Sequence, residues 1–372
     1  MADHTPANDA KPSQGASRRE FLTRTAALAG TAALLGAASK SEANIGLDPN
    51  AVVPKSGKRA PLKDGEPIKI GVIGVGGMGT GHVHAMLNIN ERKDANVQVV
   101  GLCDVCQPRW ENALAACKDK QPDVETKTYV HHEELLARED LHGVVIASTE
   151  HWHAQHSIDA IAAGKDVYCE KPMTLRLPEA LHMRKVVKAN PDIIVQVGTQ
   201  QMMRPKFQSA KKLLAENAIG KATFSQTSYC RNSKEGEWLY YKIDPNWEPG
   251  KNIDWERWCG SLGTREWSPE IYARWRRYKD YSTGIIGDLL VHVMTPMMFA
   301  LDVASGGHYV DRAMENHDQV NINVEFESGH TMVVAGSTAN DVGLETMVRG
   351  HEANIYLGGR NCVLRPERNY VD

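Results

Sequence analysis

Six consecutive residues, Gly74 to Gly79 (GVGGMG), match the pattern G-x-G-x-x-G. An apolar run at 68–74 leads into them, and a helical pattern over Gly77 to Asn90 follows. Between a strand and a helix, the first glycine permits a tight turn, the second lets the backbone approach a pyrophosphate, and the third lets helix and strand pack closely. The helix start then offers unpaired N–H groups to negative charge, so this segment predicts a dinucleotide site.

The next apolar run, 97–103, ends in an acidic residue, Asp104. At this place a carboxylate accepts hydrogen bonds from the ribose hydroxyls on the adenine side and repels a 2′-phosphate. The pattern therefore favours NAD over NADP. The alternative is a glycine-rich turn without a ligand, with Asp104 capping the following helix.

Three further residues have the chemistry to move a proton beside such a cofactor. Lys171 follows the apolar run 166–169, at the end of a parallel strand, where folds of this kind bind ligands. Asp288 and His292 are four residues apart, so on a helix they face the same way. Loss of a hydride from a carbinol carbon requires removal of the proton on its oxygen, and imidazole titrates in the useful range. The alternatives are a solvated loop lysine and a histidine that only packs.

Two other groups of residues suggest metal chemistry. His151, His153 and His156 are close in sequence, but no carboxylate at ligand spacing accompanies them. Cys103 and Cys106 form one C-x-x-C without a second pair. We expect buried thiols, no disulfide framework and no metal site.

The elements that must position these residues alternate regularly in the first half of the chain. Short runs rich in Val and Ile read as strands buried on both faces, and helical patterns lie between them. This rhythm predicts a doubly wound parallel sheet, a Rossmann domain, over residues 67–200. The expected strands are 68–74, 97–103, 143–148, 166–169 and 193–198, and the expected helices are 77–90, 109–118, 132–138, 153–163 and 177–189.

Residues 201–372 have a different pattern. A helix near 207–217 leads into a tryptophan-rich region, and one long helix is expected at about 287–303. The segments 319–328, 330–338 and 352–359 alternate apolar and polar residues, as half-solvated antiparallel strands do. We expect a substrate-binding α+β domain with one open, mostly antiparallel sheet, which could pair with a second subunit.

The N-terminus carries the clearest signal for a cell compartment. Arg18-Arg19 precedes an apolar stretch from Ala26 to Ala38, and small residues end at Ala43. The stretch is too short for a stable membrane span. Residues 1–43 resemble a twin-arginine signal peptide, which predicts export in the folded state to the periplasm, and residues 44–66 read as an extended linker.

Composition excludes one class of partner. Lys and Arg total 43 and Asp and Glu total 46, a formal charge of -3 without a long block of one sign. Such a chain has no electrostatic footprint for a phosphate backbone, so we do not expect nucleic acid as a partner.

Four motifs then occur in a known order: GVIGVGGMG (71–79), STEHWHA (148–154), GKDVYCEKP (164–172) and GIIGDLLVH (284–292). Together they resemble the sugar oxidoreductase family of glucose-fructose oxidoreductase, inositol dehydrogenase and rhizopine catabolism proteins (Gfo/Idh/MocA), from about Pro67 to the C-terminus. The resemblance implies that Lys171 reaches the substrate hydroxyl beside the nicotinamide. It also implies that His292 is the acid/base and that Asp288 orients the substrate.

One motif departs from the family pattern. Where the family has Thr-Pro and then Asn or Asp, this chain has Ser148, Thr149 and Glu150, although His153 occupies the place of a recurrent histidine. The expected catalytic residues are Lys171, His292 and Asp288. The residues expected to bind the cofactor are Gly74, Val75, Gly76, Gly77, Met78, Gly79, Asp104, Ser148, Thr149, His153, Glu170 and Lys171.

Export poses a problem for a dehydrogenase, because no replenished nicotinamide pool is expected outside the cytoplasm. We therefore expect NAD to be loaded before export, held tightly and recycled in the site, with His292 and Lys171 removing the proton from a hydroxyl of a sugar, polyol or glycoside. Two alternatives share the motifs: a redox-neutral enzyme that cleaves or epimerises a glycoside through a keto-sugar, and a catalytically silent protein that binds NAD or a sugar. Because relatives commonly continue past RPERNYVD with another helix, we also expect a short C-terminus.

Overall fold

The computed structural model describes residues 51–302, 308–309 and 319–371. The predicted signal peptide and the start of the predicted linker lie outside the described residues. From residue 51 to 66 the chain is extended, and backbone and side-chain bonds hold it to the first domain: Gly57 N donates to Ala162 O at 2.8 Å, and Ser56 N donates to Asn190 Oδ1 at 2.8 Å. Among the described residues, no helix is both long and apolar enough to cross a bilayer.

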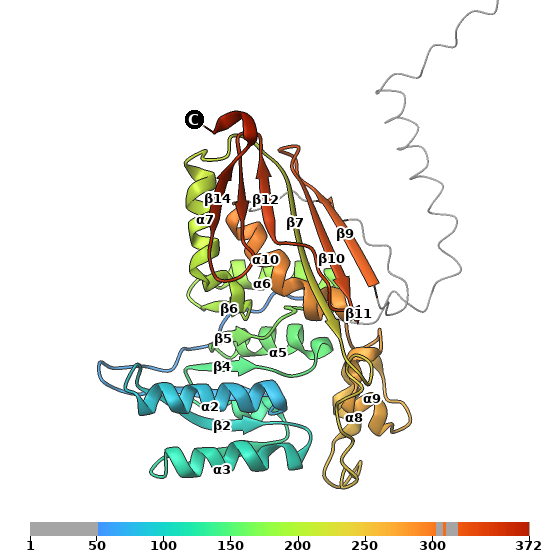
Figure 1. Ribbon diagram of the computed structural model, residues 1–372. Helices are drawn as coiled ribbons and strands as arrows, with labels where there is room; N and C mark the ends of the chain where they lie inside the picture. The colour runs from blue at the N-terminus through green and yellow to red at the C-terminus, as the bar shows by residue number, and fades with distance from the viewer. Residues whose placement is uncertain (1–50, 303–307, 310–318, 372) are drawn as a thin grey trace, which may run out of the picture. The chain divides into compact units, whose positions relative to one another are not determined.

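Six parallel strands in the order β3-β2-β1-β4-β5-β6 form the first sheet (Figure 1). This order is that of a dinucleotide-binding Rossmann fold, and it confirms the predicted doubly wound sheet. The short strand β3 was not predicted from the sequence, because its three residues are too few to show a period. The strands are β1 (Ile68–Ile73), β2 (Val97–Cys103), β3 (Lys127–Tyr129), β4 (Gly143–Ile146), β5 (Asp166–Cys169) and β6 (Val195–Val197).

Helices cover both faces of this sheet, and neighbouring strand residues point to opposite faces. Val72 and Val99 pack against α2 (Gly77–Glu91) and α3 (Trp110–Lys120). Ile73 and Val100 belong to the core with the other helices of the domain. These helices are α4 (His132–Leu136), α5 (Glu150–Ala162) and α6 (Leu177–Ala189).

Helix α5 begins three residues before the predicted start at His153. Thr149 is its extended N-cap residue, and Glu150 stands in its first turn, where a carboxylate is favourable beside the helix dipole. The sequence did not predict this start because the first turn contains buried polar residues, which break the usual alternation of apolar and polar helix faces. Nine residues of α5 are buried, and several of them are polar. The earlier start places Glu150 at the carboxyl edge of the sheet.

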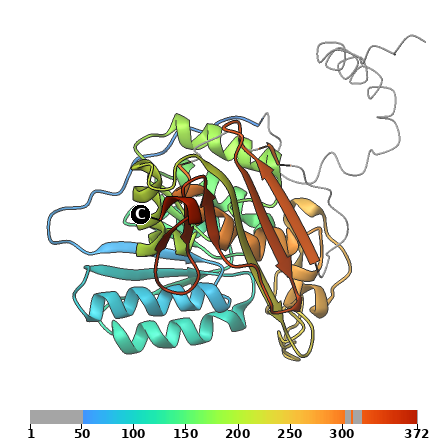
Figure 2. The ribbon, with the colours of Figure 1, turned by 45° about the horizontal axis from the view of Figure 1, so that its top comes forward.

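The second sheet has eight strands, in the order β14-β13-β12-β7-β10-β9-β8, with β11 beside β7. Its long strands run side by side in the olive to red part of the ribbon (Figure 2). All of its pairs are antiparallel except β7 with β10, so the predicted open, mostly antiparallel sheet is confirmed. Helices α7 (Pro205–Ala215) and α10 (Val291–Ala300) pack against the buried face of this sheet. The strands are β7 (Ala222–Asn232), β8 (His308–Tyr309), β9 (Gln319–Glu325), β10 (Thr331–Ser337), β11 (Ala339–Asn340), β12 (Met347–Gly350), β13 (Ala353–Tyr356) and β14 (Val363–Pro366).

In place of the single long helix expected at 287–303, the structure has a π-helical turn followed by a shorter α-helix. A π-helical turn, η5 (Ile286–Leu290), precedes α10, which ends at Ala300. A π turn holds an extra residue and is frequent at functional sites. Asp288 lies inside this turn and His292 lies at the start of α10, so the two residues are not on one regular α-helix.

Between β7 and η5 lies a segment of residues 233–282, which we call the Trp-rich segment. It contains α8 (Trp255–Cys259), α9 (Pro269–Ala273) and the 3-10 turns η3 (Gly260–Leu262) and η4 (Trp275–Arg277). Cys106 of the first domain is part of its aromatic core, and Val105 packs against that core. Backbone bonds also join the two parts: Asp254 N donates to Val105 O at 2.9 Å, and Gln107 N donates to Asn252 O at 2.9 Å.

Two glycines of α2 provide a matched test of the turn before this helix. A Cβ at Gly79 would lie 1.9 Å from Gly74 O, whereas a Cβ at Gly81 would meet no atom within 4 Å. We expect Gly79→Ala to lower the free energy of unfolding by more than about 2 kcal/mol, because the helix and the glycine turn would be forced apart. Gly81→Ala should raise it by about 0.5–1 kcal/mol, since alanine favours the helix. Urea unfolding of both variants measures the difference, and two changes of the same sign would contradict the packing described here.

Candidate active site

A cavity lies where the carboxyl ends of β1, β2, β4 and β5 meet the Trp-rich segment. Ligands of open α/β sheets bind at this edge, beside the point where the strand order reverses between β1 and β4. One wall therefore comes from the first sheet and its loops. The facing wall comes from the Trp-rich segment and consists of Tyr241, Arg257, Trp258, Tyr272, Ala273, Trp275 and Arg276.

The glycine loop forms the floor of this cavity and fits a pyrophosphate. Gly74 has a φ of +85°, and a Cβ there would lie 2.4 Å from Ser148 N. A Cβ at Gly76 or Gly77 would meet open space, so a ligand has room against this backbone. No side chain caps the start of α2, and its first N–H groups are available to an anion. Met78 also lines the cavity, whereas Gly79 provides the contact between helix and loop.

Asp104 lies on the cavity wall and is bonded to the glycine loop. Its Oδ2 accepts from Val75 N at 2.7 Å and its Oδ1 accepts from Cys106 N at 2.9 Å. Burial raises the pKa of Asp104, against the effect of these two donors. Asp104 therefore fixes the loop on one side while it faces the cavity on the other.

The loops after β4 and β5 supply the predicted residues nearest the reaction centre. Ser148, Thr149, His153, Glu170 and Lys171 all line the cavity. His153 joins the two loops, since its Nδ1 is 2.6 Å from Pro172 O and its Nε2 is 3.0 Å from Ser148 O. The Oε1 atom of Glu170 is 2.8 Å from His82 Nε2.

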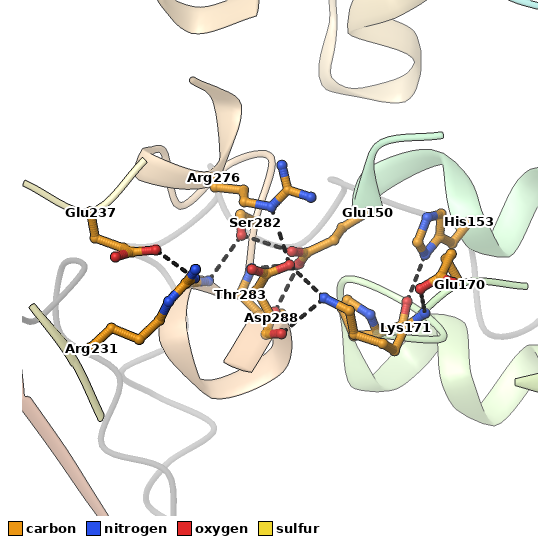
Figure 3. Close-up of polar contacts among 12 residues, drawn as sticks. Glu150, His153, Glu170, Lys171, Arg231, Glu237, Arg276, Ser282, Thr283 and Asp288 are labelled. Atoms are coloured by element: carbon orange, nitrogen blue, oxygen red, sulfur yellow. Dashed lines mark hydrogen bonds and ion pairs between the residues drawn. The ribbon is translucent and has the colours of Figure 1, made fainter. Parts of the chain in front are cut away.

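Lys171 and Asp288 form a buried ion pair (Figure 3). Lys171 Nζ donates to Asp288 Oδ1 at 2.7 Å and to its backbone oxygen at 2.9 Å. Arg276 Nε donates to the same Oδ1 at 3.2 Å. Burial opposes the charge of Asp288, but the positive charges of Arg276 and then Lys171 outweigh it and hold the pKa of Asp288 below its ordinary value. The predicted amine and carboxylate therefore meet, together with a guanidinium.

His292 lies within the field of the same charges. Burial, and then the positive charge of Lys171, lowers the pKa of His292, while Asp288 and Glu170 oppose this shift. The imidazole is therefore neutral at pH 7 and able to accept a proton. The charge of Lys171 therefore acts on His292, although His292 is not among the residues that line the cavity. Its ring centroid lies 6.2 Å from that of Tyr229.

Several residues of the site were not singled out as site residues from the sequence. Arg109 lines the cavity and stacks on Trp247, with 5.0 Å from its Cζ to the ring centroid. Arg257 bonds His132 Nδ1 at 3.1 Å and pairs with Glu133. No local motif marks these residues, because they become neighbours only when the Trp-rich segment packs on the first sheet. Of the six tryptophans in that segment, Trp258 and Trp275 line the cavity.

The residues considered for metal binding have other partners. His151 Nε2 is 2.7 Å from Trp258 O, and His156 Nδ1 is 3.0 Å from Ser148 Oγ. In the part of the chain that the structure describes, no three His, Cys, Asp or Glu side chains group as metal ligands. Cys103 and Cys106 are buried free cysteines, and burial raises the pKa of the Cys106 thiol to about 11.

The charges around His292 give a test that needs neither substrate nor cofactor. Removing the positive charge in Lys171→Met should raise the pKa of His292, because that charge disfavours the imidazolium. Removing the negative charge in Asp288→Asn should lower it further. NMR titration of the His292 ring reads both changes, with His292→Gln used to assign the signal. Shifts of the same sign in the two variants would contradict the proposed arrangement.

Comparison with known proteins agrees with this geometry. Residues 68–199 match the family model of oxidoreductases with an NAD-binding Rossmann fold, GFO_IDH_MocA. An inositol 2-dehydrogenase of Gluconacetobacter diazotrophicus is 30% identical over 167 residues, and the match covers 45% of this chain and 47% of the relative. The chain thus spans less than half the length of this curated relative.

Two solved structures share the fold across both domains. An NAD-binding oxidoreductase from Klebsiella pneumoniae is 23% identical, with a TM-score of 0.59 over 82% of this chain and 76% of that one. A levoglucosan dehydrogenase in complex with NADH is 19% identical, with a TM-score of 0.58 over 81% of this chain and 80% of that one. The Rossmann domain of this chain, residues 68–199, belongs to the Gfo/Idh/MocA oxidoreductase family.

Proposed function

We propose that this chain is an exported NAD-dependent oxidoreductase that acts on a hydroxyl of a sugar, polyol or glycoside and keeps its NAD bound. The observation that carries the proposal is the single cavity that joins the glycine loop to Lys171 and Arg276. The relatives support the substrate class, since one is an inositol dehydrogenase and one a levoglucosan dehydrogenase.

When bound, NAD supplies the hydride acceptor. His292, neutral at pH 7, takes the proton of the substrate hydroxyl on a ring nitrogen. We assign Lys171 the role of a hydrogen-bond donor to the substrate, in place of a share in the proton removal. Two of its three N–H groups donate to Asp288, and within the described residues no bond is seen for the third, which is placed to donate to the substrate oxygen as negative charge develops there. Asp288 holds this donor in place.

Retention of NAD is supported by the Trp-rich segment. Arg257 and Tyr272 of this segment line the same cavity as Asp104 and His132, and Arg257 bonds His132 Nδ1 directly at 3.1 Å. A dinucleotide bound there is enclosed between the two walls, so its release requires separation of bonds such as Arg257 to His132. Retained NAD also requires that the hydride return within the site, either to a second substrate or to the same substrate after an intermediate step. Export by the twin-arginine route fits a protein that leaves the cytoplasm with its cofactor.

Mass spectrometry of the denatured protein tests retention directly. We expect about one NAD per chain after extended dialysis of the wild type. Arg257→Gln should release NAD about tenfold faster, a change of about 1.4 kcal/mol, because the bonds to His132 and Glu133 are lost. Arg265→Gln is the matched control, since Arg265 lies in the same segment but pairs with Asp280. Wild-type protein that loses its NAD on dialysis would refute retention, and NADP in its place would refute the cofactor assignment.

Reduction of bound NAD by a panel of myo-inositol, D-glucose and methyl glucosides tests the reaction. The rate of hydride transfer should fall as the pH drops through the pKa of His292, since only the neutral ring accepts a proton. That pKa lies below the ordinary histidine value. His292→Ala should slow transfer by about 10²–10⁴-fold and lose this pH step, with NAD still bound. Absorbance at the NADH band measures the rate, and near-normal transfer by this variant would reject the role of His292.

A further inference from the structure

Glu150 is a buried carboxylate that the proposed reaction does not use. Its exposed fraction is 1%, and it is absent from the cavity wall. It accepts three hydrogen bonds from two consecutive residues of the second domain: from Ser282 Oγ at 2.8 Å, from Thr283 N at 2.7 Å and from Thr283 Oγ1 at 2.8 Å (Figure 3). A carboxylate this deep is costly unless its oxygens are paired, and here both are.

The two ends of this contact belong to the two halves of the site. Glu150 is the first residue of α5 and directly follows Ser148 and Thr149, which line the cavity beside the glycine loop. Ser282 and Thr283 lead into the π turn that carries Asp288. The hydrogen bonds therefore link the cofactor side of the cavity to the segment that holds the reactive side chains.

Gly287, the residue before Asp288, packs closely between Thr283 and the loop that carries Lys171. A Cβ at Gly287 would lie 1.8 Å from Thr283 Oγ1 and 3.3 Å from Pro172 Cγ. Thr283 thus contacts the residue before Asp288, and Pro172, the residue after Lys171, contacts it as well. Because backbone and side chains are in contact here, a shift of Thr283 must displace the turn that holds Asp288.

As a carboxylate, Glu150 accepts from all three donors, although burial and then the negative charge of Asp288 raise the pKa of Glu150 to about 7. A glutamine at this position has one accepting oxygen and an NH₂ group that faces a donor, so at least one buried donor loses its partner. The charged groups that act on Glu150 from other elements are Asp288 in η5 and Arg276 in η4.

We propose that Glu150 is a positioning residue that sets the distance between the cofactor-facing loop, Ser148–Thr149, and the Lys171–Asp288 pair. The inference rests on the proposed function, because the consequence is a rate of hydride transfer. A near-attack arrangement tolerates little displacement, and misplacement of about 1 Å costs on the order of 100-fold in rate.

The test compares Glu150→Gln with Glu179→Gln. Glu179 is a matched control: it is 3% exposed and its Oε2 accepts from Leu175 N and Arg176 N, but it lies in the capping box of α6, away from the cavity wall. We expect both variants to keep bound NAD and to lose similar thermal stability. Only Glu150→Gln should slow reduction of bound NAD, by about 10- to 100-fold, with little change in KM. Equal slowing in both variants, or wild-type transfer in Glu150→Gln, would overturn the proposal.

A double-mutant cycle tests the route through Thr283. Thr283→Val removes one of the three donors and keeps the shape of the side chain. Alone it should slow transfer less than Glu150→Gln, and on the Glu150→Gln background it should add little. Full additivity of the two effects would show that the residues act separately and would overturn the proposal.

A second readout needs no turnover and separates this inference from the proposed function. Hydrogen exchange of the peptide covering residues 282–292 should be faster in Glu150→Gln than in the wild type or in Glu179→Gln. If no hydroxyl compound reduces bound NAD in the wild type, the proposed function fails. Hydrogen exchange still tests whether the bonds of Glu150 to Ser282 and Thr283 hold the π turn. Unchanged exchange in Glu150→Gln would overturn this inference.

Discussion

The buried ion pair between Lys171 and Asp288 is the constraint on which the site depends. Its side chains are 11% and 8% exposed, and the residues are 117 positions apart in the sequence. Taking two charges out of water is costly, and their attraction compensates only when geometry and additional hydrogen bonds are good. Arg276 and the backbone oxygen of Asp288 supply such bonds, so the pair specifies one relative position of β5 and η5.

Rigid elements hold the two halves of this pair. Lys171 follows a buried strand, and Asp288 lies in a π turn that continues into α10, which packs on the second sheet. The loop after β4 contributes Ser148 and Thr149 from the same sheet edge. A reaction centre on strand ends and helix starts varies less in geometry than one on free loops.

The Trp-rich segment adds a second wall to an otherwise common architecture. Its aromatic rings pack on each other, as in the stacked pair Trp255 and Trp258 with ring centroids 4.8 Å apart. Such packing stabilises the conformation of the segment. Arg257, at its edge toward the first sheet, pairs with Glu133. The cavity therefore lies between the carboxyl edge of the first sheet and this segment.

Local patterns were enough to predict the first domain and the identity of most candidate residues. The glycine motif, the Val-rich runs and the order of motifs are each encoded in a few neighbouring residues, so sequence predicts them directly. Strand β3, the early start of α5 at Glu150 and the π turn at 286–290 escaped prediction because each is short or set by packing. Tertiary structure alone decided that Lys171 donates to Asp288, that Arg276 joins them, and that Glu150 reaches Thr283. These contacts join residues more than ten positions apart, and long-range neighbours follow from how sheets and helices pack, which no local period records.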